Sequence, residues 1–371
     1  MSVKSRSRWK HACVGAALVC AQVLVTAAPG GAADDVNARS TQGNGAYGPM
    51  YHVAGQLIDV PSSGTRLGDV RRDWSAAYFA SRADYNADGI GDACGVDINF
   101  SNVGNSTLEC AFGVAGEGLG PTVVASGLFD AGSASRLRDA RHGTADVAAD
   151  GRDEIVVVAP STNPAMAQVD IVGLDADVTV EHTRQQLIWP VSGKIDTLVV
   201  GEVHTVAGDA DSYPDLLAAS GLEILIAKGN PTGFGDFELI GTLPTKFDQG
   251  DFSLHALSDG KGVERVVLAY RGTSKMYLWG VRVGSQIHRA HQPWRIGRMP
   301  GNVDQWVHNS LTTTDTDGDG IHELSMMYHR YAYPTQGRLW EWELGRNKLD
   351  GPQRRRRLLN VTNNTFRVGA V

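Results

Sequence analysis

Residues 84–92 read DYNADGIGD, and residues 315–323 read DTDGDGIHE. In both stretches oxygen-bearing side chains stand at the first, third and fifth positions, a glycine at the sixth and an acid at the ninth. Such a pattern, present twice and far apart in one chain, indicates an internal repeat. A repeat of this kind decides the fold class before any single element does.

Three further segments are degenerate copies of the pattern, and each segment ends its loop in an acid. These closing acids are separated by 62, 61, 49 and 59 residues, and they are Asp92, Glu154, Asp215, Glu264 and Glu323. An apolar run follows most of them, such as EIVVVAP at 154–160 and RVVLAYR at 265–271. Short apolar runs bounded by turn residues predict buried β-strands.

A repeat of ~50–60 residues with about four strands is typical of a β-propeller blade. We therefore expect an all-β fold, with a β-propeller over residues 49–371. The expected repeats are about 75–135, 136–195, 196–250, 251–305 and 306–364.

The two ends of this region complement each other. The segment MYHVAGQLIDV at 50–60 predicts strands of a blade whose first strand is missing. The segment NTFRVGAV at 364–371 predicts a first strand without the rest of its blade. If they pair, the ring has five full blades and one blade shared by the termini, with no open sheet edge. The alternative is a five-bladed ring with a loose tail.

Residues 1–33 have the pattern of a secretory signal peptide: a basic start, an apolar run, and small residues up to Ala33. The alternative is a membrane anchor, but the apolar run is short for a span. We expect cleavage near Ala33, a flexible linker at 34–48, secretion, and no membrane span after removal of the signal.

The composition is globular, with 42% hydrophobic and 20% charged residues. The formal net charge of −7 becomes −11 without residues 1–33, which hold four of the 34 basic residues and none of the 41 acids. An acidic chain is a poor candidate for nucleic acid or anionic membranes and a natural one for divalent cations. We expect a monomer.

Cys94 and Cys110 are the two cysteines that remain after removal of the signal. In an exported chain, one remaining pair predicts a disulfide. Two free buried thiols are the alternative.

The acid-rich loops have the donors of a Ca²⁺ site. Alternating oxygen side chains in a tight loop can converge on one point, glycine permits the sharp turn, and the carbonyl of the seventh residue adds a ligand. An EF-hand would need Glu at the twelfth position, where Gly95 and Met326 stand, and flanking helices. Solvated Asp-Gly turns are the remaining alternative.

The expected structural Ca²⁺ ions number about two to four. The full ligand sets are Asp84, Asn86, Asp88, Ile90 and Asp92 in the first loop, and Asp315, Asp317, Asp319, Ile321 and Glu323 in the fifth. Reduced sets are Asp146, Asp150 and Glu154 in the second loop, and Asp209, Asp211 and Asp215 in the third. The fourth keeps only Asp259, Gly260 and Glu264.

Loops such as GDADSYPDLLAAS and TDTDGDGIHELSMM, each followed by an apolar strand, resemble the FG-GAP/VCBS repeat of integrin-α-type β-propellers. The resemblance covers about residues 75–330 and implies the fold and calcium loops rather than a function. The FG-GAP motif itself matches this sequence poorly, and at least one loop lacks the ligand residues. The stretch DYNADGIGDACGVD is also similar to the loop of thrombospondin type 3 repeats. In that family such loops follow one another at much shorter intervals.

No nucleophile elbow, phosphate loop or dinucleotide fingerprint occurs in the sequence, so we assign no catalytic residue. We expect a non-catalytic binding or adhesion module for an extracellular protein or glycan. The alternative is a polysaccharide lyase or hydrolase built on a propeller, which rests on fold analogy. RLWEWEL at 338–344 predicts a strand that buries Trp340 and Trp342, rather than exposed sugar-binding rings. The arginines at 354–357 suggest a solvated turn.

Overall fold

A computed structural model of the chain describes the strands and several of the loops between them. The described residues are 50–53, 56–59, 70–73, 77–90, 92–97, 106–114, 118–126, 129, 134–137, 139–174, 179–203, 213–247, 252–258, 264–271, 276–281, 294–298, 312–314, 323–330, 333–344, 349–357 and 368–370. The expected signal peptide and linker lie outside these residues.

The protein is all-β, as predicted, and the described residues form six four-stranded antiparallel sheets. Two sheets come from the first part of the chain, β4 (Ala77–Ala83), β5 (Asp92–Asp97), β6 (Thr107–Val114) and β7 (Gly118–Ser126), then β8 (Arg141–Ala145), β9 (Glu154–Pro160), β10 (Met166–Leu174) and β11 (Val180–Ile188). The next comprises β12 (Thr197–Gly201), β13 (Asp215–Ser220), β14 (Glu223–Ala227) and β17 (Glu238–Thr242), with a small hairpin of β15 (Gly229–Asn230) and β16 (Gly233–Phe234).

Two more sheets follow: β18 (Phe252–Ser258), β19 (Glu264–Arg271), β20 (Met276–Val281) and β21 (Trp294–Arg298), then β22 (Thr312–Thr314), β23 (Glu323–Arg330), β24 (Tyr333–Leu344) and β25 (Leu349–Arg357). Helix is confined, among the described residues, to α1 (Ala134–Leu137) and a 3₁₀ turn at Thr245–Phe247.

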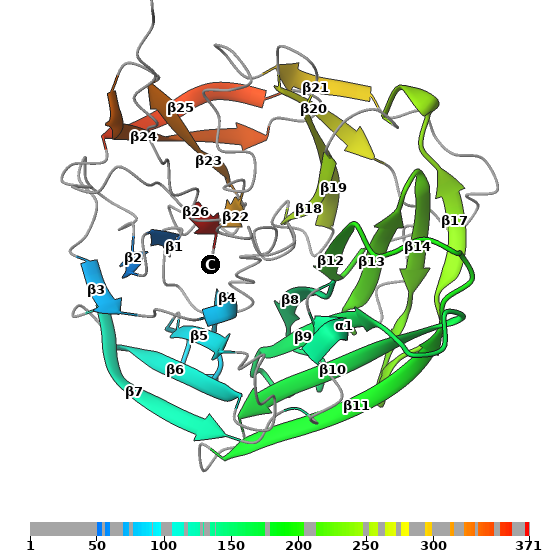
Figure 1. Cartoon of the computed structure of the whole chain (residues 1–371). Helices are drawn as coiled ribbons and strands as arrows, with labels where there is room; N and C mark the ends of the chain where they lie inside the picture. Colours follow the sequence, from blue (N-terminus) through cyan, green and yellow to red (C-terminus); the bar gives the residue numbers. More distant parts are fainter. Residues whose placement is uncertain are drawn as a thin grey trace, which may run out of the picture.

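The sheets follow one another around a common centre, and the first strand of each lies nearest that centre (Figure 1). Contacts between first strands connect neighbouring sheets: β4 contacts β8, β8 contacts β12, β12 contacts β18, and β18 contacts β22. The later strands of each sheet lie progressively farther out (Figure 1).

The remaining sheet joins the two ends of the described chain. Strand β26 (Val368–Ala370) pairs with β1 (Met50–Val53), which pairs with β2 (Gln56–Asp59) and then β3 (Val70–Asp73). In the register between them, Tyr51 lies opposite Ala370 and Val53 opposite Val368. A strand from residues 364–371 therefore occupies the edge of the N-terminal sheet, where one was expected.

The hydrophobic core lies between adjacent sheets. Strand β9 contributes to both of its faces: Ile155 and Val157 pack toward β5 and β6, whereas Val156 and Val158 pack toward β12 and β13. All four side chains are fully buried. Because both faces of this strand are covered, its sequence is a continuous apolar run rather than an alternating one, and each such side chain contributes about 1.5–3 kcal/mol.

Strand β24 confirms one detail of the sequence analysis, and β25 contradicts another. Trp340 and Trp342 are buried, with ring centroids 6.0 Å apart, as the alternation predicts. The arginines at 354–357 lie in β25 and pair with β24, so the interpretation as a turn is wrong. Cross-strand pairing with a long neighbouring strand overrides the low β-propensity of a charged run.

Candidate functional site

The closing acids occupy one equivalent position throughout the structure. Each is the first residue of the second strand of its sheet: Asp92 in β5, Glu154 in β9, Asp215 in β13, Glu264 in β19 and Glu323 in β23. Each therefore ends the loop that leaves the innermost strand. The closing acids therefore stand at equivalent corners of five sheets.

The first loop is held by its own carboxylates. The backbone N–H groups of Asp88 and Gly89 donate to Asp84 Oδ1 and Oδ2 at 3.1 and 2.8 Å. The N–H of Ile90 donates to Asp88 Oδ1 at 2.7 Å. Asn86 adds an acceptor for the N–H of Asp88 at 3.1 Å. These bonds wind residues 84–90 into a tight loop around the two carboxylates.

The second loop repeats this geometry in the neighbouring sheet. The N–H groups of Asp150 and Gly151 donate to Asp146 Oδ1 and Oδ2 at 3.0 and 2.8 Å, and the N–H of Arg152 donates to Asp150 Oδ1 at 3.0 Å. The fourth and sixth positions are left-handed in both loops, with φ values of 60° and 77° at Ala87 and Gly89 in the first. The second has φ values of 56° at Ala149 and 91° at Gly151. Alanine in this region is strained, so the matching pattern reflects a shared loop structure rather than two chance turns.

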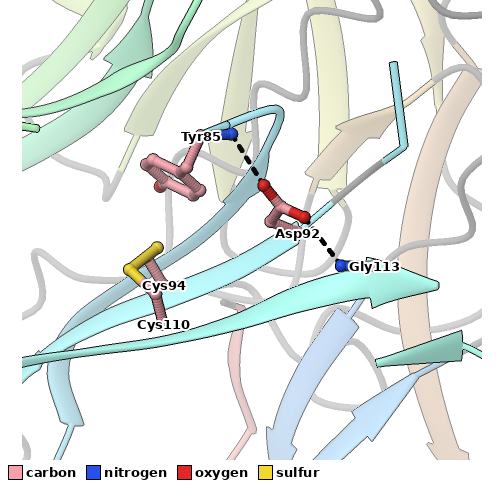
Figure 2. The surroundings of a disulfide bond; sticks show 5 residues. All are labelled: Tyr85, Asp92, Cys94, Cys110 and Gly113. Atoms are coloured by element: carbon pink, nitrogen blue, oxygen red, sulfur yellow. Dashed lines mark hydrogen bonds between the residues drawn. A yellow bond between two sulfur atoms is a disulfide. The ribbon is translucent and has the colours of Figure 1, made fainter. Parts of the chain in front are cut away.

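The closing acids of the first two loops accept hydrogen bonds from their own loops, and Asp92 also binds the third strand of its sheet. Asp92 accepts hydrogen bonds from the N–H of Tyr85 at 2.9 Å and from the N–H of Gly113 in β6 at 2.7 Å (Figure 2). Glu154 accepts from the N–H of Val147 at 2.7 Å. A Cβ at Gly173 in β10 would lie 2.8 Å from Glu154 Cγ, so this position has no room for a side chain.

Burial disfavours the ionised form of these acids. Burial raises the pKa of Asp92 to about 7, although its two backbone hydrogen bonds act in the opposite direction, and the carboxylates of Asp88 and Asp84 raise it further. Burial likewise raises the pKa of Glu154 to about 8, with the nearby Asp146 carboxylate adding to the effect. The pKa of Asp84 is also raised, first by burial.

The disulfide lies next to the first loop. Cys94 and Cys110 are directly opposite each other on β5 and β6, with Cα atoms 4.1 Å apart, and both are buried. Figure 2 shows the bridge on the same pair of strands that present Asp92 and Gly113. The predicted pairing is thus confirmed, and the bridge holds together the two strands that anchor the closing acid.

Replacing both cysteines, Cys94→Ser with Cys110→Ser, is expected to lower the free energy of unfolding by about 3 kcal/mol, because the bridge closes a loop of 16 residues. Denaturant unfolding of the two proteins measures this difference. Mass spectrometry of unreduced mature protein is expected to show the two cysteines in one cross-linked peptide. Two alkylatable thiols before reduction would contradict the bridge.

The first two loops contact each other. The N–H of Asp153 donates to the carbonyl of Asp84 at 2.9 Å, and Asp153 Oδ2 accepts from the N–H of Asp84 at 3.0 Å. A Cβ at Gly151 would lie 3.7 Å from Ala87 Cβ, which is ordinary contact distance. The two loops therefore form one continuous structure across the boundary between their sheets.

A guanidinium group distinguishes the second loop from the first. Arg152 Nε donates to Asp150 Oδ2 at 3.0 Å, a second guanidinium nitrogen forms an ion pair with the same oxygen, and Nη1 donates to the carbonyl of Leu174 at 3.1 Å. Hydrogen bonding from Arg152 lowers the pKa of Asp150. The second loop thus contains a positive charge at the position where the first has Ile90.

The predicted ligands are only in part described by the structure. Asp209, Asp211, Asp315, Asp317, Asp319 and Ile321 lie outside the described residues. Asp215 accepts a hydrogen bond from the N–H of Gly229 at 3.0 Å, and Glu323 is buried at the start of β23. Within the described ranges, no group of three or more His, Cys, Asp or Glu side chains has an arrangement that would hold a metal ion.

The donor chemistry of the first loop nevertheless fits a hard cation. Asp84, Asn86, Asp88 and Asp92 and the carbonyl of Ile90 are all oxygen donors, as Ca²⁺ requires. Burial raises the pKa of Asp84 and of Asp92, so their ionised forms would be favoured by a nearby positive charge. A bound divalent cation would supply that charge.

Two polar clusters lie away from the loops. Ser253 Oγ and His255 Nε2 are 2.7 Å apart on β18, but their residues are only 2% and 0% exposed, which keeps a substrate from reaching them. Asp170 in β10 is fully buried. It accepts hydrogen bonds from Gln168 Nε2 at 2.7 Å and from Arg184 Nε at 2.7 Å, and His182 Nε2 lies 2.9 Å from it. This network joins β10 to the outer strand β11.

Burial raises the pKa of Asp170, but the hydrogen bonds from His182, Gln168 and Arg184 outweigh it and hold the pKa below its usual value of 3.8. Because the folded-state pKa is depressed, the stabilisation is present above pH 3.8 and is lost as the pH falls through the lower folded-state value. Asp170→Asn is expected to destabilise the protein by about 2 kcal/mol at pH 7 and by less in acid. Denaturant unfolding of both proteins from pH 7 to pH 3 measures this, with the exposed Asp139→Asn as control. An equal difference at both pH values would contradict an ionised Asp170.

None of the helices in the described part of the chain has the length and apolar character needed to cross a membrane.

No protein-family model and no curated protein matches this sequence. Two solved structures are similar over much of the chain, each at 11% identity. The first is BBS1N in complex with ARL6DN, soaked with lead, which covers 83% of this chain and 84% of its own with a TM-score of 0.36. The second is the rhamnogalacturonan lyase PL11 of Bacillus licheniformis, which covers 76% of this chain and 59% of its own with a TM-score of 0.27. Likeness at these TM-scores assigns neither a fold nor a function to this chain.

Proposed function

We propose that the chain is an exported, calcium-stabilised β-propeller of the FG-GAP/VCBS type that binds an extracellular protein or glycan without catalysis. The observation that carries this proposal is the repeated loop. Two acid-rich loops in adjacent sheets share the same hydrogen bonds and the same two left-handed positions. Their closing acids occupy a position that recurs in five sheets.

The propeller architecture is supported by the strand order. Five of the six sheets are each built from four strands of one continuous stretch, and these stretches lie within the five units of the sequence repeat. The sixth combines β26 with β1–β3, as a blade shared by the two ends of the described chain would. The disulfide supports export, because such bridges persist in oxidising compartments.

Calcium is proposed first for the loops at 84–92 and 315–323, which have the full ligand sets, and then for those at 146–154 and 209–215. Carboxylates that accept hydrogen bonds from the loop backbone or that bind a cation are not available for proton transfer. This favours a binding protein over an enzyme. Ser253 and His255, whose side chains lie at hydrogen-bond distance, are both buried.

The proposal is tested by screening the mature protein on a glycan array with calcium and with chelator. Calcium-dependent retention of one glycan class is the expected result. In parallel, acidic and neutral polysaccharides are incubated with the protein and examined for chain shortening or new unsaturated ends. Turnover that is lost on replacing a His or Tyr outside the loops would overturn the binder in favour of the lyase or hydrolase.

A further inference from the structure

Asp153 gives the second loop a carboxylate at a position where the first loop has no side chain. It stands one residue before the closing acid, and the first loop has Gly91 at this position. Asp153 is only 2% exposed. Its backbone N–H and its carboxylate together form the two hydrogen bonds to Asp84, at 2.9 and 3.0 Å. Asp84 is the first residue of the first loop, and its carboxylate organises the N–H groups of that loop.

The second loop has its own means of staying ordered. Arg152 bonds to Asp150 within the loop and to the carbonyl of Leu174 in β10, so it ties the loop to the body of its sheet. The first loop has Ile90 at the corresponding place, and this side chain offers no charge to the carboxylates of its loop. The second loop therefore has a tie between its own carboxylate and β10 that the seventh residue of the first loop does not provide.

We propose that the second loop is a fixed support for the first, and that Asp153 is the positioning residue which holds the first loop in the shape that binds a divalent cation. This inference rests on the proposed function, because it takes the first loop to be a calcium site. Ordering a loop costs about 1–2 kcal/mol per residue in backbone entropy. A loop already held at Asp84 loses less entropy on binding, and its affinity rises accordingly.

The test compares calcium affinity in full-length mature variants by titration calorimetry. Asp153→Ala removes the side-chain acceptor and is expected to weaken binding at the first loop about tenfold, within the range typical of coupled sites. Asp153→Asn keeps an oxygen at the same place and is expected to retain most of the affinity. The exposed acid Asp139, replaced by Ala, changes the net charge equally outside both loops and is expected to have no effect.

A second readout needs no metal. In chelator, hydrogen exchange at the amides of Asp88 and Gly89 is expected to speed up in Asp153→Ala but not in Asp139→Ala. Arg152→Gln is expected to speed up exchange at Gly151 as well, because the second loop loses its internal cation.

The outcomes separate the two proposals. If the wild-type protein binds no calcium, the calcium site and the inference both fail. If wild-type and Asp153→Ala proteins bind calcium equally and exchange equally, the site stands and the support by the second loop is overturned. If Asp153→Asn is as weak as Asp153→Ala, the carboxylate charge matters and the positioning role through hydrogen bonding is wrong.

Discussion

A protein that lacks residues 365–371 is expected to melt roughly 5–10 °C below the full chain. These residues include β26, which pairs with β1 over three residue pairs, from Tyr51 opposite Ala370 to Val53 opposite Val368. The deletion removes the backbone hydrogen bonds of these pairs and leaves β1 as an unpaired edge. It also removes the strand that joins the last described residues to the first, so the loss frees both of these segments at once.

Thermal unfolding followed by circular dichroism measures this effect. Gly369→Pro, which removes a backbone donor within β26, is expected to reproduce part of the fall, because proline cannot donate to a ladder. Deletion of Val371 alone, which lies outside β26, is the matched control and is expected to leave the melting temperature unchanged. A truncated protein that melts with the full chain would show that the ends do not close the structure.

Calcium is expected to raise the melting temperature by an amount equivalent to about 2.7 kcal/mol for each site at a hundredfold excess over its dissociation constant. The physical reason is that the ion binds the folded loops and not the unfolded chain. Asp84→Ala with Asp88→Ala removes two ligands of the first loop and is expected to reduce the calcium-induced shift. Asp317→Ala with Asp319→Ala is expected to do the same for the fifth.

The quantity to compare is the shift between calcium and chelator, not the melting temperature itself. Asp84 and Asp88 also accept hydrogen bonds from loop N–H groups, so their loss destabilises the protein in chelator as well. Asp139→Ala with Glu238→Ala removes two exposed acids outside the loops and is expected to keep the full shift. Identical melting curves of the wild-type protein in calcium and in chelator would exclude calcium as a structural ligand.

Local patterns in the sequence were sufficient for the apolar strands and for the disulfide bridge. The runs after Glu154 and Asp215 are apolar because both faces of β9 and β13 are covered. A continuous apolar run therefore predicts a strand that is buried on both faces. The disulfide followed from the presence of one cysteine pair after the expected signal. The alternation of RLWEWEL was enough to bury Trp340 and Trp342, since side chains two apart share a face of a strand.

The same patterns failed where a contact depends on the neighbouring sheet. The charged run at 354–357 has low β-propensity, and only pairing with β24 makes it a strand. Asp153 and Asp84 are 69 residues apart in the sequence, and nothing in the residues around either indicates that they meet. The network around Asp170 likewise needs β11 to bring His182 and Arg184 to a carboxylate on β10.

The all-β character, the start of a strand at each closing acid and the donor types in each loop follow from local sequence patterns. These depend on periodicity and on turn chemistry within a few residues, which are local. The tertiary structure adds the contact between the first two loops and the bonds of Arg152 within the second, and it settles the open alternative for the chain end by pairing β26 with β1. These contacts depend on how separate sheets pack, because the free energy that selects them comes from burying side chains that are distant in the chain.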